Sequence, residues 1–109
     1  MNNYSKDAVI LVRYPFSDLT LSKVRPAVVV GATRFSQDIL IVPLTSKTQS
    51  LLPGEFVLKN WKKSGLNTTT AVKRGVYTIE KRLVIKTIGK LSKSDAEKLE
   101  NSLKEWLEL

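Results

Sequence analysis

The stretch Lys23-Val-Arg-Pro-Ala-Val-Val-Val30 decides the fold. A proline pushes the residue before it toward extended geometry, so Arg25 is expected outside any helix. The β-branched run after Pro26 predicts a buried strand over residues 25–31. The guanidinium of Arg25 is therefore expected at the start of a strand whose other residues are buried. Rigid strand ends hold charged side chains in a fixed position. Taken alone, an arginine in this position is more often a solvated edge residue than a catalytic one.

Short apolar and β-branched runs elsewhere in the chain predict further strands. They span residues 7–14, 38–44, 55–58, 68–74, 76–79 and 82–88. Pro43 indicates a bulge or an edge, because proline donates no hydrogen bond to a ladder. Asn60 predicts the cap of a short helix that runs to about Ser64 and is ended by Gly65. Gly89 is expected to end the last strand.

The final segment predicts a helix that packs on the sheet. Ser94 and Glu97 have the spacing of a capping box. Apolar residues then recur at helical spacing, at Ala96, Leu99, Leu103, Trp106 and Leu107. Trp106 is therefore expected in the core. Several short strands followed by one helix predict a single α+β domain over residues 1–109, mainly β and built as a small antiparallel barrel.

The charge is high and unevenly placed. The formal net charge is +8. Residues 1–90 hold 15 basic and 5 acidic side chains (+10), whereas residues 91–109 hold 3 and 5 (−2). A cationic body predicts a polyanionic partner, either nucleic acid or an acidic protein segment, although charge also serves solubility. No apolar run has membrane length and no signal-peptide pattern is seen, so no membrane association is expected. The absence of Cys is compatible with a reducing cytoplasm, and a cytoplasmic (prokaryotic) location is expected.

The residue types that are missing from the chain limit the reactions that it can catalyse. The chain has no Cys and no His, and its carboxylates are scattered among different elements. The usual general base, the commonest metal ligand and a thiol nucleophile are therefore missing. A two-metal site needs several acidic ligands close together. The sequence thus predicts no metal and no cofactor, and any catalysis must use Arg, Lys, Asp, Glu, Tyr, Ser or Thr.

Basic and hydroxyl side chains gather at the strand ends. Thr45, Ser46 and Lys47 follow the strand at 38–44. Antiparallel neighbours set the start of one strand beside the end of the next, so Arg25 and Thr45 are expected to face each other. A guanidinium with hydroxyls suits a phosphate. Alternatively, Thr45 and Ser46 satisfy backbone groups of a turn, and the sequence leaves both readings open. Further positive charge is expected from Lys73 and Arg74.

Several segments resemble the MazF/PemK family of toxin endoribonucleases. The similarity lies in Val12-Arg-Tyr-Pro-Phe-Ser-Asp-Leu19, Lys23-Val-Arg-Pro-Ala-Val-Val-Val30 and Val42-Pro-Leu-Thr-Ser-Lys47. Residues 55–58, 60–66 and 88–91 also fit, so it runs from about residue 7 into the last helix. The resemblance implies an SH3-like barrel, a homodimer, a cognate antitoxin with an acidic C-terminal segment, and metal-independent cleavage of single-stranded RNA. RNA itself supplies the nucleophile, a 2′-hydroxyl that attacks its neighbouring phosphate and leaves a 2′,3′-cyclic phosphate.

The resemblance also assigns site residues. The family's catalytic Arg corresponds to Arg25 and its active-site Thr to Thr45, with Ser46 beside it. The segment from Phe16 to Lys23 corresponds to a substrate-gating loop. The residues implied to contact RNA are Phe16, Ser17, Lys23, Lys47, Lys73 and Arg74.

One departure keeps other functions open. Members often carry Arg-x-Asp before a Thr-Ile or Thr-Leu pair, but residues 71–79 contain no Asp, and Lys73 alone matches a basic residue. A nuclease-dead RNA-binding barrel is therefore one alternative. Another is a non-nuclease toxin that acts on a protein such as gyrase, because related toxins act through a C-terminal Trp. Here Trp106 lies within the helical stripe instead.

Overall fold

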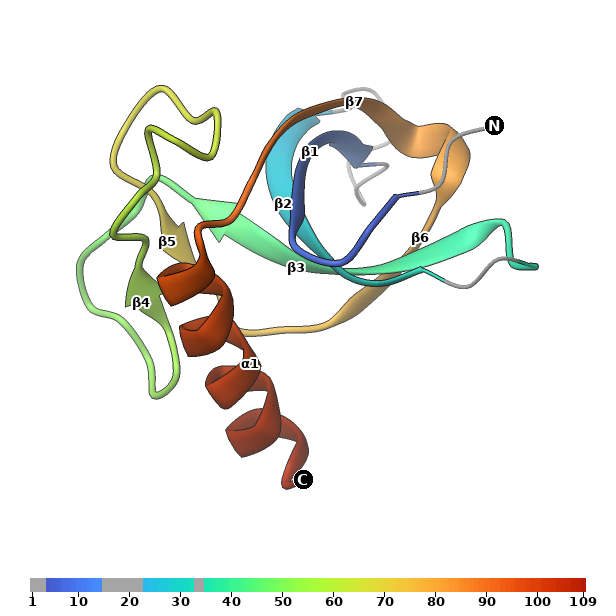
Figure 1. Cartoon of the computed structure of the whole chain (residues 1–109). Helices are drawn as coiled ribbons and strands as arrows, with labels where there is room; N and C mark the ends of the chain where they lie inside the picture. Colours follow the sequence, from blue (N-terminus) through green and yellow to red (C-terminus); the bar gives the residue numbers. More distant parts are fainter. Residues whose placement is uncertain (1–3, 15–22, 33–34) are drawn as a thin grey trace.

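The computed structural model describes residues 4–14, 23–32 and 35–109, which form short strands and one long helix (Figure 1). The elements are β1 (Ala8–Tyr14), β2 (Lys23–Ala32), β3 (Asp38–Thr45), β4 (Phe56–Val57), β5 (Ala71–Val72), β6 (Tyr77–Glu80), the 3-10 turn η1 (Lys81–Leu83), β7 (Val84–Lys90) and α1 (Lys93–Leu107). The predicted α+β class, mainly β with a C-terminal helix, is confirmed.

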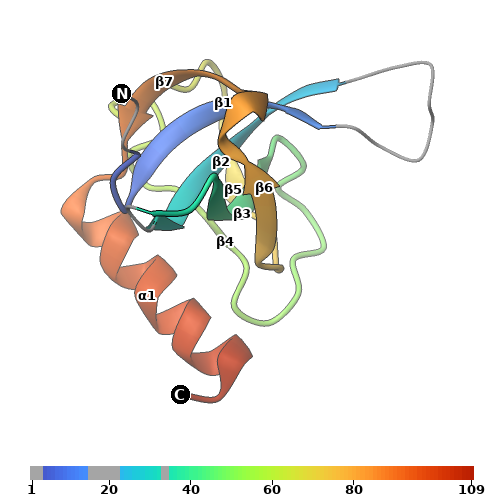
Figure 2. The same cartoon turned by 90° about the vertical axis from the view of Figure 1, so that its right-hand side faces the viewer.

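All the strand pairings in the described residues are antiparallel, in the order β4-β5-β3-β2-β1-β7, and β6 also pairs with β3. The sheet curves strongly, as Figures 1 and 2 show from two directions. It is not a closed barrel, because no ladder among the described residues joins β7 to β4 or β6. The small antiparallel barrel expected from the sequence is thus a strongly curved sheet that stays open among the described residues.

Strand β2 begins two residues earlier than predicted, so Arg25 lies inside the strand rather than before it. Pro26 is opposite Leu11 of β1. The neighbour on the other side, β3, pairs with β2 only from Ala27 onward. Pro26 is thus at a local edge, where its missing N–H removes no ladder hydrogen bond. The ladder irregularity in this pair falls between Val29 and Gly31 and not at Pro43.

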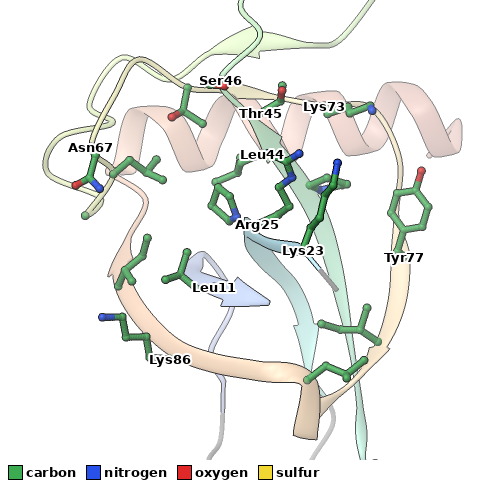
Figure 3. A pocket seen from close by; sticks show the side chains of 18 of the residues that line it. Leu11, Lys23, Arg25, Leu44, Thr45, Ser46, Asn67, Lys73, Tyr77 and Lys86 are labelled. Atoms are coloured by element: carbon green, nitrogen blue, oxygen red, sulfur yellow. The ribbon is translucent and has the colours of Figure 1, made fainter. Parts of the chain in front are cut away.

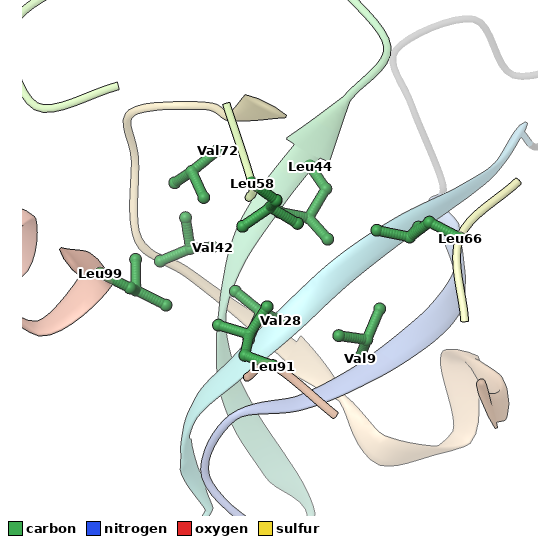
Figure 4. Packing of buried hydrophobic residues seen from close by; sticks show 9 residues of the cluster. All are labelled: Val9, Val28, Val42, Leu44, Leu58, Leu66, Val72, Leu91 and Leu99. Carbon is green, nitrogen blue, oxygen red and sulfur yellow. The ribbon is translucent and has the colours of Figure 1, made fainter. Parts of the chain in front are cut away.

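The central strands are apolar on both faces, and so they separate two core clusters. Val28 belongs to the first cluster, whereas Ala27 and Val29 belong to the second, because successive side chains point to opposite faces. The first cluster, drawn in Figure 4, comprises Val9, Val28, Val42, Leu44, Leu58, Leu66, Val72, Leu91 and Leu99. The last of these comes from α1, which therefore covers this face of the sheet.

Helix α1 is capped by Ser92, whose Oγ accepts the Asp95 N–H at 3.3 Å. The capping box predicted at Ser94 and Glu97 is wrong by two residues. The apolar stripe is confirmed in its middle, with Leu99 buried, while Leu107 is largely exposed.

Trp106 packs against the first core cluster, and its indole N–H donates to the Pro53 carbonyl at 2.9 Å. This residue therefore has a structural role that accounts for its place in the stripe.

Residues 60–65 form hydrogen-bonded turns, so the predicted short helix is wrong. A long-range contact fixes the start of this segment: the Asp95 carboxylate, fully buried on α1, accepts the N–H groups of Lys59 and Asn60, each at 2.9 Å. Gly65 then has φ +89 and its backbone lies against Ile88 and Gly89. Gly89 continues β7, opposite Val9, instead of ending it, because the absence of a Cβ allows this close approach.

Candidate functional site

An open cavity of about 1390 Å³ lies on one side of the curved sheet. Its lining comes from the start of β2, the end of β3, strands β6 and β7, and the segment 65–70. These parts are far apart in the sequence and are brought together by the curvature of the sheet (Figure 3). The cavity lining contains most of the predicted site residues, namely Lys23, Arg25, Thr45, Ser46 and Lys73.

Arg25 stands in the middle of this cavity in Figure 3, with Lys23 beside it. The two residues are two positions apart on β2, so their side chains leave the same face of the strand. The backbone of Arg25 pairs with that of Val12, which is fully buried in β1. A charged and exposed side chain is thereby mounted on a rigid strand.

Thr45 and Ser46 lie at the upper rim in Figure 3, where β3 leaves β2 and pairs with β5. The Oγ1 of Thr45 accepts the N–H of Lys47 at 3.1 Å. The turn role left open by the sequence is therefore present. Because a hydroxyl has one donor and two acceptor positions, Thr45 still has its O–H to donate to a ligand.

Positive charge exceeds negative charge in the cavity. The basic side chains are Lys23, Arg25, Lys73 and Lys86, and the acidic ones are Asp38 and Glu80. The salt bridges seen within residues 4–14, 23–32 and 35–109 use none of these four basic side chains. Their charge is therefore available to an anion.

Glu80 is engaged elsewhere. Its carboxylate is 2.8 Å from Nε of Arg82, and the hydrogen bond and charge of Arg82 lower the pKa of Glu80. Glu80 therefore stays ionised and is a weak proton acceptor, which leaves Asp38 as the other carboxylate in the cavity lining.

Two predicted RNA contacts lie outside the cavity lining. Lys47 is exposed just beyond it. Arg74 lines a separate small cavity with Pro53 and Trp106. Its N–H donates to the Glu55 carboxylate at 2.7 Å. Burial raises the pKa of Glu55, but the N–H groups of Arg74 and Leu52 and nearby positive charge outweigh it, so this pKa is lowered. Phe16 and Ser17 lie outside the described residues.

The sequence analysis missed several lining residues, namely Lys86, Asn67, Thr68 and Tyr77. Lys86 carries charge on β7, and Tyr77 is the first residue of β6, two positions after Gly75, which has positive φ. Their residue types were visible in the sequence, but only the curvature of the sheet brings β6, β7 and residues 65–70 to the same side as Arg25.

In the described parts of the chain, no group of three or more Asp and Glu side chains is placed to hold a metal ion. No helix there has the length and apolar character needed to cross a membrane. The arrangement that remains is a guanidinium, hydroxyls and amines around one open space. Chemically, it can bind a phosphodiester and stabilise added negative charge on it.

Comparisons with known proteins bear on the family and the fold of this chain. A family model for the PemK-like, MazF-like toxin of type II toxin–antitoxin systems matches residues 7–107. No curated protein matches by sequence search.

Solved structures with the same fold include an endoribonuclease in complex with its cognate antitoxin from a mycobacterial species. It is 20% identical, with a TM-score of 0.73 over 95% of this chain and 94% of that one. The toxin MazF-mt6 of Mycobacterium tuberculosis is 19% identical, with a TM-score of 0.73 over 94% and 97%. A MazE–MazF complex from Deinococcus radiodurans is 11% identical, with a TM-score of 0.81 over 100% and 99%.

Proposed function

The chain belongs to the family of PemK-like, MazF-like toxins of type II toxin–antitoxin systems, and we propose that it is a metal-independent endoribonuclease that cleaves single-stranded RNA. The observation that carries the proposal is the cavity in which Arg25 lies with Thr45, Ser46 and an excess of positive charge. Similar structures described as endoribonucleases support it.

Arg25 is assigned the main catalytic role. Attack of the ribose 2′-hydroxyl places additional negative charge on the phosphate, and a guanidinium offers two hydrogen bonds and a full positive charge to those oxygens. A guanidinium keeps its proton in proteins and is a poor general base, so any proton that Arg25 transfers goes to the leaving 5′ oxygen. Thr45 donates its O–H to the same phosphate, and Ser46 lies beside it at the rim.

Lys23, Lys73 and Lys86 bind the RNA backbone on either side of the reacting phosphate. Each neutralised phosphate contributes to affinity in a way that falls with rising salt. The backbone N–H of Lys73 donates to the Pro43 carbonyl at 2.9 Å, which holds this residue next to the end of β3. RNA affinity is therefore expected to fall steeply with ionic strength.

We expect cleavage to persist in EDTA, because RNA supplies the nucleophile and the site uses side chains alone. Purified protein is incubated with a long RNA in EDTA and, separately, with Mg²⁺, and product ends are identified by mass spectrometry. The expected product carries a 2′,3′-cyclic phosphate, and a 2′-deoxy residue at the cut is expected to block the reaction. Loss of activity in EDTA that Mg²⁺ restores would overturn the mechanism.

The same incubation decides between the alternatives. A nuclease-dead RNA-binding barrel would bind the RNA and leave it intact. A toxin that acts on a protein target would do neither.

The proposed partner is a cognate antitoxin whose acidic C-terminal segment occupies the RNA cavity. Similar structures that contain an antitoxin support this assignment. The cationic body would attract such a segment and speed the encounter. A segment that orders only on binding costs roughly 2–5 kcal/mol, so the interface must be large, which a homodimer would provide.

We expect the C-terminal peptide of the antitoxin to compete with RNA for the protein. Competition is measured by fluorescence anisotropy with a labelled RNA that cannot be cleaved, and light scattering gives the oligomeric state of the free protein. An antitoxin peptide that binds without lowering RNA affinity would place its site elsewhere. A monomer at micromolar concentration would remove the homodimer from the proposal.

A further inference from the structure

Two uncharged residues of the cavity lining, Asn67 and Tyr77, have side chains that can contact a nucleobase. Figure 3 shows them on opposite sides, with Arg25 between them. We infer that they bind the two unpaired bases that flank the phosphate held by Arg25: Tyr77 stacks on one base, and Asn67 hydrogen-bonds the edge of the other. The inference rests on the proposed RNA substrate and makes Asn67 a determinant of sequence preference.

Tyr77 is a preorganised surface for a base. Its side chain is 51% exposed on β6, although it borders the cavity. The ring tip lies against Gly75, where an added Cβ would be 2.7 Å from Cε2 and 3.0 Å from Oη. Gly75 also has φ +141. Because the ring rests on the main chain and keeps an exposed area, little order needs to be gained before a base stacks on it.

Asn67 is presented by a segment that is fixed at both ends. Leu66 on one side is buried, and its N–H donates to the Trp61 carbonyl at 3.2 Å. Thr70 on the other side is buried, and its Oγ1 donates to the Thr68 carbonyl at 2.8 Å. Asn67 itself is exposed. Its amide offers both a donor and an acceptor, which is what reading the edge of an unstacked base requires.

The charge of the cavity favours RNA over a protein as the occupant of this rim. A half-exposed tyrosine alone would also suit a protein interface. Here, however, four basic side chains line the same space, and aromatic rings interleaved with basic side chains are typical of single-stranded nucleic-acid sites.

The test measures binding without cleavage. Fluorescein-labelled 2′-fluoro octamers of A, of C and of U lack the 2′-hydroxyl nucleophile, so their affinities are independent of nuclease activity. Affinities are measured by anisotropy for the wild type, Tyr77→Ala, Tyr77→Phe and Asn67→Ala. Matched controls are Phe35→Ala, an aromatic that is 96% exposed and does not line the cavity, and Thr69→Ala, the exposed neighbour of Asn67 that also lies outside its lining.

We expect Tyr77→Ala to weaken binding about 5- to 150-fold, from the usual contribution of base stacking, and Tyr77→Phe to bind within about twofold of the wild type. Asn67→Ala should shrink the differences among the three octamers by about 2- to 10-fold. Both controls should match the wild type. Wild-type affinity in Tyr77→Ala, or no octamer binding by the wild type, overturns the inference.

Two further outcomes separate this inference from the proposed nuclease. Tyr77-dependent binding by a protein that leaves long RNA intact supports the inference and refutes the nuclease. Cleavage of RNA with no dependence of binding on Tyr77 does the reverse. A smaller particle by light scattering for Tyr77→Ala, with RNA affinity unchanged, would show a protein contact and also overturn the inference.

Discussion

Arg25→Ala is expected to lower the rate of RNA cleavage about 100- to 1,000-fold. The change removes the preorganised guanidinium from the centre of the cavity, where the structure has neither a histidine nor a metal ligand cluster among its described residues to take over. The side chain is exposed, so the fold is expected to survive. Cleavage of a defined RNA is measured in single turnover, at matched circular dichroism.

Arg74→Ala is the matched control for this prediction. It removes the same type of side chain from an exposed position outside the cavity lining. The Glu55 contact of Arg74 uses the backbone N–H and is therefore kept. We expect cleavage close to the wild-type rate. Near wild-type turnover in Arg25→Ala, or an equal loss in both variants, would refute the catalytic assignment of Arg25.

Gly65→Ala is expected to lower the free energy of unfolding by about 2–5 kcal/mol. A Cβ at this position would overlap the main-chain carbonyl of Ile88, and φ is +89, a conformation that alanine adopts only with strain. The obstacle is backbone on β7, which cannot rotate away as a side chain can. Urea unfolding followed by tryptophan fluorescence measures the change.

Gly31→Ala separates this steric effect from the general effect of replacing a glycine. Its Cβ would meet Cδ1 of Leu40 at 3.3 Å, and Leu40 is 42% exposed, so the side chain has room to move. We expect a change within about 1 kcal/mol. Equal stability of Gly65→Ala and the wild type would show that the close contact between the backbone of Gly65 and that of residues 88–89 is not fixed in solution.

Local patterns predicted the parts of the fold that depend on neighbouring residues. The predicted end of strand β3 lies within one residue of the observed end, because its β-branched run favours a strand over any other element. The helix stripe was also visible. The N-cap of α1 was misplaced because both Ser92 and Ser94 can cap a helix. The buried Asp95 carboxylate accepts the N–H groups of residues 59 and 60, and this contact goes with Ser92 as the cap. That contact spans more than thirty residues, and no local pattern reports it.

The residues of the candidate site also fall into those that the sequence predicted and those that it did not. Arg25, Thr45 and Ser46 were found from strand ends and family resemblance, and the structure places them in one cavity. Their roles stay predictions. Tyr77, Asn67 and Lys86 were missed because each reaches the cavity through a tertiary feature, such as the bend of the sheet or the turn anchored by Asp95. Arg74, which the sequence analysis grouped with Lys73, lines a separate small cavity, and its contact with RNA stays a prediction.

The segment between Leu66 and Thr70 has a consequence for engineering. Its two buried ends carry the packing, whereas residues 67–69 are exposed. Most surface substitutions change stability by less than about 0.5 kcal/mol, so a combinatorial library at these three positions should consist mostly of folded protein. If residue 67 reads a base as inferred above, directed evolution at these positions is expected to change the RNA sequence preference while Arg25 and its strand are left untouched.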